Sequence, residues 1–181
     1  CMYEANGFHC RGVLTFQGPQ SIGKTAWIRK LLPVSLANYI KIDHHLDASN
    51  KDSILIALSH LIVEIGELDS SFRKDIARLK GFLTADRDKI RRPYGRYQDD
   101  YQRRTVFCAT VNHGNFLVDD TGNSRWWTIP VTSIDYDHSI DVLQLWAQVR
   151  DELYKQNEKW WLSPDEEKAL NESNLNFRSV S

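Results

Sequence analysis

The stretch with the clearest chemical meaning is FQGPQSIGKT, at residues 16–25. A short apolar run leads into a loop that has glycine at both ends and finishes in lysine and threonine. Residues 18–25 fit G-x-x-x-x-G-K-[ST], a pattern that cradles nucleotide phosphates when it lies between a strand and a helix. Backbone amides and the helix N-terminus direct positive charge at the phosphates, Lys24 reaches the β and γ phosphates, and Thr25 offers its hydroxyl to Mg²⁺. The predicted nucleotide-binding residues are Gly18, Ser21, Ile22, Gly23, Lys24 and Thr25.

Two carboxylates follow a second apolar run, LIVEI at residues 61–65. Nucleotide hydrolysis needs acidic groups that hold Mg²⁺ and orient the attacking water. We assign Glu64 to the metal and Glu67 to the water. The alternative is a pair of surface carboxylates that happen to follow a strand. The expected nucleotide is ATP rather than GTP, because the guanine-reading pattern N-K-x-D has Ser53 where it needs aspartate.

Two further polar residues complete the candidate catalytic set. Asn112 ends an apolar run and is placed to reach a γ-phosphate or the attacking water. Arg125 directly precedes the aromatic run WWTIPV and can stabilise the charge that spreads over the transferring phosphoryl oxygens, often from a neighbouring subunit. The alternatives are a turn asparagine and a solvent-exposed arginine.

A basic segment, KIRRPYGRY at residues 89–97, suits contact with nucleic acid. Cations bind backbone phosphates, and the interleaved tyrosine rings can stack on bases. Pro93 and Gly95 predict a turn. The predicted DNA-binding residues are Lys89, Arg91, Arg92 and Arg96. The alternatives are a solvated charged loop and a subunit contact through Arg96.

Apolar periodicity predicts the elements that position these residues. Strands are expected at residues 12–17, 39–43, 61–65, 105–111 and 126–131. Helices are expected at residues 28–32, at 52–59, from a cap at Ser70 or Ser71 to Leu83, at 141–156, and after the capping box at 163–166. The third helix has an apolar stripe and a solvent face: the stripe is Phe72, Ile76, Leu79 and Leu83, and the solvent face is Arg73, Lys74, Arg78 and Lys80.

Strands that alternate with helices predict an α/β fold with a mainly parallel sheet covered by helices on both faces. Ligands bind at the ends of such strands. The segment 86–104 has no clear period and is expected to be irregular. The 181 residues are expected to form a single domain.

The overall composition limits the class of protein. Lys and Arg number 23 against 24 Asp and Glu, so a nucleic-acid role depends on a local cluster and not on net charge. Three cysteines without framework spacing favour a reducing compartment, and no apolar run approaches the roughly 20 residues that span a bilayer. We therefore expect a cytoplasmic protein without membrane contact. Because the chain starts at Cys1 and its first strand follows within about a dozen residues, we expect a piece of a longer polypeptide.

The ordered set GPQSIGKT, IVEIGELD, DKIRRPYGR, the run ending in Asn112, and GNSRWW resembles the virulence-associated protein E family. Members are P-loop ATPases of phages and genomic islands, related to superfamily 3 helicases and their attached primases. The resemblance covers roughly residues 12–177. It implies an AAA+-like core that forms a hexameric ring, with ATP at the subunit boundary and single-stranded DNA in the central channel. It also implies a possible primase portion in the same polypeptide.

The resemblance also implies roles for individual positions. Carried over by position, Lys24 and Thr25 form the Walker A pair, Glu64 and Glu67 are the Walker B acids, Asn112 is the sensor and Arg125 is the arginine finger. In superfamily 3 enzymes a hairpin between the acidic motif and the sensor strand enters the channel, which is where the basic segment lies. Family members often have two arginines before the aromatic run, and here Ser124 takes the first place.

The leading hypothesis from the sequence is an ATP-hydrolysing DNA helicase or translocase domain that serves replication of a phage or mobile element, with ATP and Mg²⁺ as cofactors. One alternative is a non-motor module that uses ATP as a switch for assembly or regulation. The other is a P-loop kinase with a small acceptor. ATP turnover that DNA stimulates would separate the motor from both.

Overall fold

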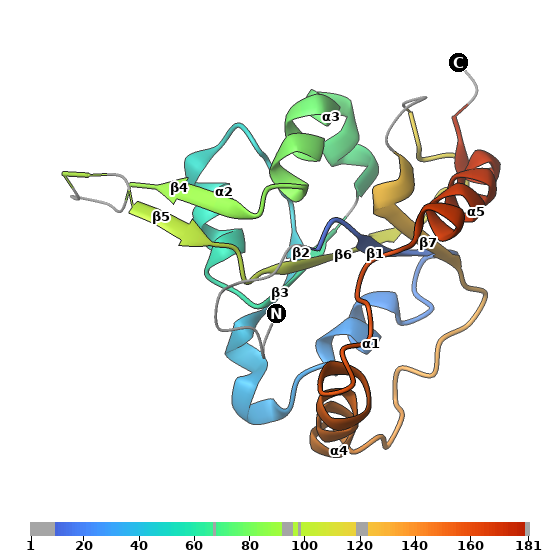
Figure 1. Ribbon diagram of the computed structural model, residues 1–181. Helices are drawn as coiled ribbons and strands as arrows, with labels where there is room; N and C mark the ends of the chain where they lie inside the picture. The colour runs from blue at the N-terminus through green and yellow to red at the C-terminus, as the bar shows by residue number, and fades with distance from the viewer. Residues whose placement is uncertain (1–9, 67, 92–95, 98, 119–122, 180–181) are drawn as a thin grey trace.

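The computed structural model describes residues 10–66, 68–91, 96–97, 99–118 and 123–179. Its centre is a five-stranded sheet in the order β2-β3-β6-β1-β7, in which all neighbouring strands are parallel (Figure 1). The strands are β1 (Val13–Gln17), β2 (Ile40–His44), β3 (Ile62–Ile65), β6 (Val106–Val111) and β7 (Trp126–Pro130). The five predicted strands and the parallel α/β fold are confirmed.

Helices cover both faces of this sheet (Figure 1). The α-helices are α1 (Lys24–Arg29), α2 (Lys51–Leu58), α3 (Leu68–Leu83), α4 (Val142–Gln148) and α5 (Pro164–Asn174). Shorter helical turns are η1 (Val34–Tyr39), η2 (Asn123–Arg125), η3 (Val149–Tyr154) and η4 (Leu175–Phe177). Among the described residues, no helix combines the length and the apolar character that a membrane span requires.

Side chains that alternate along the strands divide the core into two apolar clusters. On β6, Phe107, Ala109 and Val111 join the cluster under α2 and α3, where Leu79 and Leu83 are buried. Cys108 points to the other face and packs with residues of β1 and α1. Burial on both faces is what a parallel sheet requires, and it explains why its strands read as continuous apolar runs.

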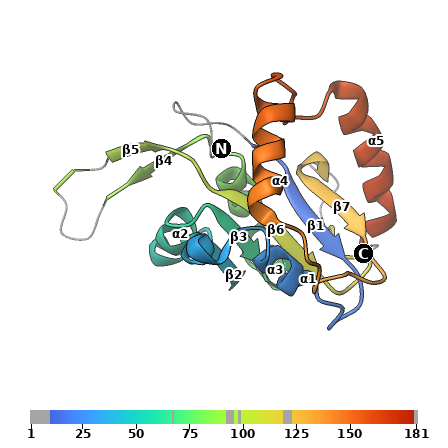
Figure 2. The ribbon, with the colours of Figure 1, turned by 90° about the horizontal axis from the view of Figure 1, so that it is seen from below.

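The segment expected to be irregular contains an antiparallel hairpin, so that prediction was wrong. Strands β4 (Arg87–Ile90) and β5 (Asp99–Gln102) pair with Arg87 opposite Gln102 and Ile90 opposite Asp99. The hairpin projects away from the central sheet (Figures 1 and 2). Its strands are short and carry mostly charged or polar residues, so periodicity gave no signal for them.

A buried ion pair fixes the base of the hairpin to the body of the domain. Arg103 Nε donates to Asp88 Oδ2 at 2.9 Å, and a second guanidinium nitrogen donates to Asp88 Oδ1. A further nitrogen of Arg103 donates to the carbonyl of Phe82, and the guanidinium carbon lies 4.3 Å from the centroid of the Phe82 ring. Arg103 therefore joins the hairpin to the last turn of α3.

Three predicted helices differ in detail from the structure. The helix expected at residues 28–32 is α1, Lys24–Arg29. α3 begins at Leu68, before the predicted caps at Ser70 and Ser71. Lys80 was expected in solvent but is only 8% exposed. Leu79 and Leu83 are buried as well, so the buried face of α3 at this end includes Lys80 in addition to the predicted apolar stripe. The side chains of Phe72, Arg73, Lys74 and Ile76 lie outside the description. The predicted helix at 141–156 starts as α4 and continues as the π-helical η3.

The last predicted helix is confirmed together with its cap. Ser163 Oγ accepts from the backbone N–H of Glu166, and the Glu166 carboxylate accepts from the backbone N–H of Ser163 at 2.7 Å. Pro164 occupies the first helical position, where its missing N–H costs nothing.

Candidate functional site

The loop between β1 and α1, residues 18–23, lies at the carboxyl edge of the sheet. Its first amide, Gly18 N–H, donates to the carbonyl of Val111 at 3.1 Å, which ties the loop to β6. Two of its residues have positive φ, namely Ser21 at 66° and Gly23 at 94°. Of the predicted loop residues, Ser21 is exposed, and Ile22 and Gly23 are half-buried.

Close neighbours explain why this loop has glycine at both ends. A Cβ on Gly18 would lie 2.0 Å from the carbonyl oxygen of Val131. A Cβ on Gly23 would lie 2.2 Å from the ring of Tyr136, and the positive φ of Gly23 already disfavours a side chain. Both glycines are therefore required by the segment that follows β7 as well as by the loop itself.

Lys24, the first residue of α1, turns its side chain back into the loop. Its Nζ donates to the carbonyls of Gly18 at 2.7 Å and Pro19 at 2.6 Å, and to Asn112 Oδ1 at 3.0 Å. These acceptors occupy all three donors of the ammonium. Burial lowers the pKa of Lys24 below its ordinary value, and the negative charge of Glu64 opposes that shift. A phosphate oxygen is a stronger acceptor for this cation than the neutral oxygens around it.

Glu64, at the centre of β3, is fully buried and has its carboxylate hydrogen-bonded on both oxygens. Its Oε1 accepts from Thr25 Oγ1 at 2.8 Å and from Thr110 Oγ1 at 2.7 Å. Its Oε2 accepts from the backbone N–H of Asp43 at 2.7 Å. These donors hold the carboxylate in one orientation beside Thr25, as a buried charge requires.

An open cavity of about 470 Å³ lies over these groups, a volume within the usual range for small-molecule sites. Of the predicted residues, Ser21, Gly23, Lys24, Thr25 and Asn112 line it. Glu64 lies beneath it, bonded to Thr25. The cavity offers a cation and loop amides to an anion, and hydroxyl and carboxylate oxygens to a hard divalent cation.

Asp43 and Thr110 are among the polar residues of this cavity that the sequence did not predict. Both come near the carboxyl ends of predicted strands, the place where ligands bind in α/β folds, and that position was the available signal. Asp43 has a positive φ of 52°, and a Cβ on Gly66 would lie 2.0 Å from its carboxylate. Thus Gly66 leaves room for Asp43 at the cavity wall.

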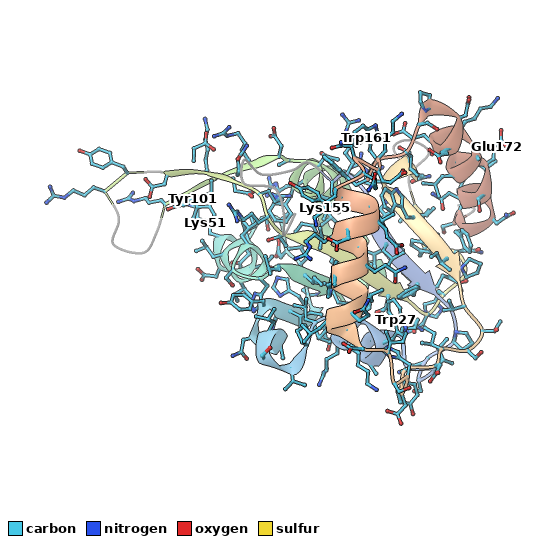
Figure 3. All side chains as sticks on the ribbon, turned by 60° about the horizontal axis from the view of Figure 1, so that its bottom comes forward. Trp27, Lys51, Tyr101, Lys155, Trp161 and Glu172 are labelled. Carbon is cyan, nitrogen blue, oxygen red and sulfur yellow. The ribbon has the colours of Figure 1, made fainter. Side chains whose placement is uncertain are left out.

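Arg125 lies at the other edge of the sheet. It ends η2, directly before β7, and β7 runs parallel to β1 with Trp126 opposite Val13 and Pro130 opposite Gln17. Arg125 therefore does not join Lys24 and Glu64 in its own chain. It lines a second cavity of about 780 Å³, together with Trp127, Trp160 and Trp161. Figure 3 shows Trp161 between the end of the α4 segment and α5.

The predicted DNA-binding residues lie on or near the hairpin. Lys89 is exposed on β4, and Arg91 and Arg96 are exposed near the hairpin's tip, where Tyr97 is 81% exposed. Figure 3 shows Tyr101 on the same hairpin, far from α5. Arg92, and the predicted water-orienting Glu67, lie outside the described residues.

Comparison with known families identifies the class of this domain. The sequence profile of the virulence-associated protein E-like domain matches residues 2–179. The chain therefore belongs to that family, which confirms the resemblance seen in the sequence. Comparison with curated proteins gives no significant match.

Solved structures with a similar fold include the C-terminal region of NrS-1. One apo structure has a TM-score of 0.53 and 15% identity, and the match covers 95% of this chain and 44% of that one. The A form apo structure has a TM-score of 0.50 and 15% identity, with 97% and 36% covered. The chain thus spans less than half the length of these structures, and at this identity the likeness concerns the fold alone.

Proposed function

We propose that this domain binds ATP and Mg²⁺ in the cavity beside loop 18–23 and hydrolyses ATP as the motor of a DNA helicase or translocase in phage or mobile-element replication. One observation carries the proposal: Lys24, Thr25, Glu64 and Asn112, which come from three separate parts of the sequence, meet around this loop. Family membership supports the biological setting.

The loop fits the phosphates of a nucleotide. Gly18 and Gly23 let the loop pack closely against Val131 and Tyr136. The helix N-terminus that follows the loop favours negative charge. Lys24 already lies within the loop, so a phosphate can replace the neutral carbonyls that hold its ammonium. The first role of the loop is thus to bind and orient the phosphate chain.

The oxygen donors beside the loop fit Mg²⁺. Thr25 directs its hydroxyl proton to Glu64, which leaves the hydroxyl oxygen free to bind a cation. Glu64 would hold the metal directly or through its water ligands, as Mg²⁺ usually retains several waters. A metal held there would neutralise negative charge that develops on the phosphate oxygens.

Asn112 supports the γ-phosphate end of the site. Its amide oxygen accepts from Lys24, so its amide nitrogen is the group that it can offer to a phosphate oxygen or to water. The side chain is exposed at the end of β6, beside the cavity. We therefore assign Asn112 to orienting the transferring group, and Glu67 to the attacking water.

The hairpin supplies the DNA contact in this proposal. Lys89, Arg91 and Arg96 are exposed on a projecting element, and Tyr97 of the same element is also exposed. Cations with an aromatic ring suit a single strand, because they bind phosphates while the ring stacks on a base.

The first test is steady-state ATP hydrolysis with and without single-stranded DNA, at several protein concentrations. We expect Lys24→Ala to lower the rate by at least about 100-fold, because it removes a cation from the transferring phosphoryl group. Lys168→Ala, an exposed lysine on α5, is the matched control and should leave the rate unchanged.

The same measurement separates the alternatives. A rate that depends on Lys24, rises with protein concentration and is stimulated by DNA supports the motor. Tight ATP binding without hydrolysis would contradict it and favour the nucleotide switch. Phosphoryl transfer to a small acceptor, without an effect of DNA, would favour the kinase.

A further inference from the structure

The phosphate loop, residues 18–23, has two unlike sides. In the sheet order β2-β3-β6-β1-β7, the strands that carry Asp43, Glu64 and Thr110 all lie on one side of β1. On the other side lies β7, which is followed by the segment of residues 131–141 (Figure 2). The acidic and hydroxyl groups thus belong to one side of the loop, and segment 131–141 to the other.

Segment 131–141 contacts the phosphate loop and the end of α1 at several points. The Val131 amide donates to the carbonyl of Gln17 at 2.8 Å, directly before the loop begins. Asp137 forms an ion pair with Lys30, just beyond α1, at 3.0 Å. Between these two points, the ring of Tyr136 lies against Gly23. The segment therefore forms a wall beside the loop.

Tyr136 has the properties of a stacking residue. Its ring contacts Gly23, yet the residue is 48% exposed, so much of its surface stays available to a ligand. A turn in which the Tyr136 amide donates to the carbonyl of Ile134 at 3.0 Å helps to fix its backbone. Aromatic rings stack on nucleobases, and an aromatic ring beside a phosphate loop is close to where a base must lie.

The direction of the nucleotide follows from the metal-binding groups. Glu64, which would hold the metal with Thr25, and Asn112, which would contact the γ-phosphate, both lie on the acidic side of the loop. They would place the γ-phosphate end of the nucleotide on that side. The ribose and base of the nucleotide would then lie on the opposite side of the loop, near β7. We infer that Tyr136 stacks on the base of the bound nucleotide and that segment 131–141 forms the base side of the site. This inference rests on the proposed function.

The test compares ligands with and without a base. Isothermal titration calorimetry would measure the binding of ADP and of pyrophosphate, each with Mg²⁺, to the whole chain and its variants. We expect Tyr136→Ala to weaken ADP binding by about tenfold or more, the effect of losing one stacked base, and to change pyrophosphate binding by less than about twofold. Tyr136→Phe keeps the ring and should retain ADP binding. Tyr39→Ala, at a tyrosine that is 49% exposed, is the matched control.

The outcomes distinguish this inference from the proposed function. If Tyr136→Ala weakens ADP and pyrophosphate equally, or leaves ADP binding unchanged, the stacking role is overturned while nucleotide binding stands. If the unaltered chain binds neither ligand, the proposed function fails, and the inference fails with it. Pyrophosphate binding by Tyr136→Ala also shows that the phosphate loop of the variant is folded.

Discussion

Single residues set the shape of the phosphate loop, and its two glycines do so for different reasons. Gly18 has no room for a side chain, because the carbonyl of Val131 occupies that space. Gly23 combines the same restriction, imposed by Tyr136, with a left-handed backbone at φ 94°. The loop conformation therefore depends on a segment more than 100 residues away in the sequence, as well as on its own motif.

We predict that Gly23→Ala destabilises the protein and weakens nucleotide binding. The left-handed conformation alone costs a residue with a side chain about 1–2 kcal/mol, and displacement of Tyr136 adds to this. Gly81→Ala in α3 is the control, since a Cβ there meets no atom within 4 Å. The control should stabilise the helix by about 0.5–1 kcal/mol. Urea unfolding measures the change in the free energy of unfolding for both variants. Equal changes for Gly23→Ala and Gly81→Ala would contradict the positive φ at Gly23.

The sequence predicted part of the candidate site and missed the rest for a physical reason. Lys24 and Thr25 belong to a local pattern whose spacing alone implies phosphate chemistry. Asp43, Thr110 and Tyr136 have ordinary local sequences, and their places at the cavity or beside the loop depend on which strands become neighbours. Strand order comes from packing between distant segments, which spacing along the chain does not encode.

Among the elements, the hairpin differs most from what apolar periodicity predicted. Two ion pairs of different burial involve its strands. The pair between Asp88 and Arg103 is buried, with side chains 10% and 5% exposed, while the pair between Arg87 and Asp100 is exposed, at 52% and 44%. Because water screens the outer pair, the two should contribute very differently to stability.

We predict that Asp88→Ala lowers the free energy of unfolding by about 3–5 kcal/mol, because Arg103 is left as a buried cation without its carboxylate. Asp100→Ala removes the exposed partner on the facing strand and should cost less than about 1 kcal/mol. Chemical denaturation of both variants gives the comparison. Similar losses would mean that the buried pair does not anchor the hairpin.

The central strands were predictable because they are buried on both faces, which makes them apolar along their whole length. The hairpin strands RDKI and DDYQ have few apolar residues, so their sequences resemble a charged loop. What fixes the hairpin is the contact of Arg103 with Asp88 and with the end of α3. A single arginine in a basic segment gives no sign that it will be buried.

At the scale of the whole molecule, the polarity of the sheet separates two groups that ATP hydrolysis would use. Lys24 follows the carboxyl end of β1, and Arg125 precedes the amino end of β7, which is parallel to β1. The first and last Cα atoms of the five-residue strand β7 are four steps apart, which is roughly 13 Å at about 3.3 Å per step. An arginine at that edge can act on a nucleotide only if the nucleotide belongs to a neighbouring chain.

This arrangement predicts complementation between two inactive variants. Lys24→Ala keeps Arg125 but cannot bind phosphates properly, and Arg125→Gln has the opposite defect. In a mixture, some interfaces pair an intact Lys24 with an intact Arg125, so the steady-state rate of ATP hydrolysis should exceed the mean of the two variants measured alone. The rate should be highest at intermediate mixing ratios. A rate that follows the mean at every ratio would show that Arg125 does not act across a subunit boundary, and would leave it a structural role in the cavity with Trp160 and Trp161.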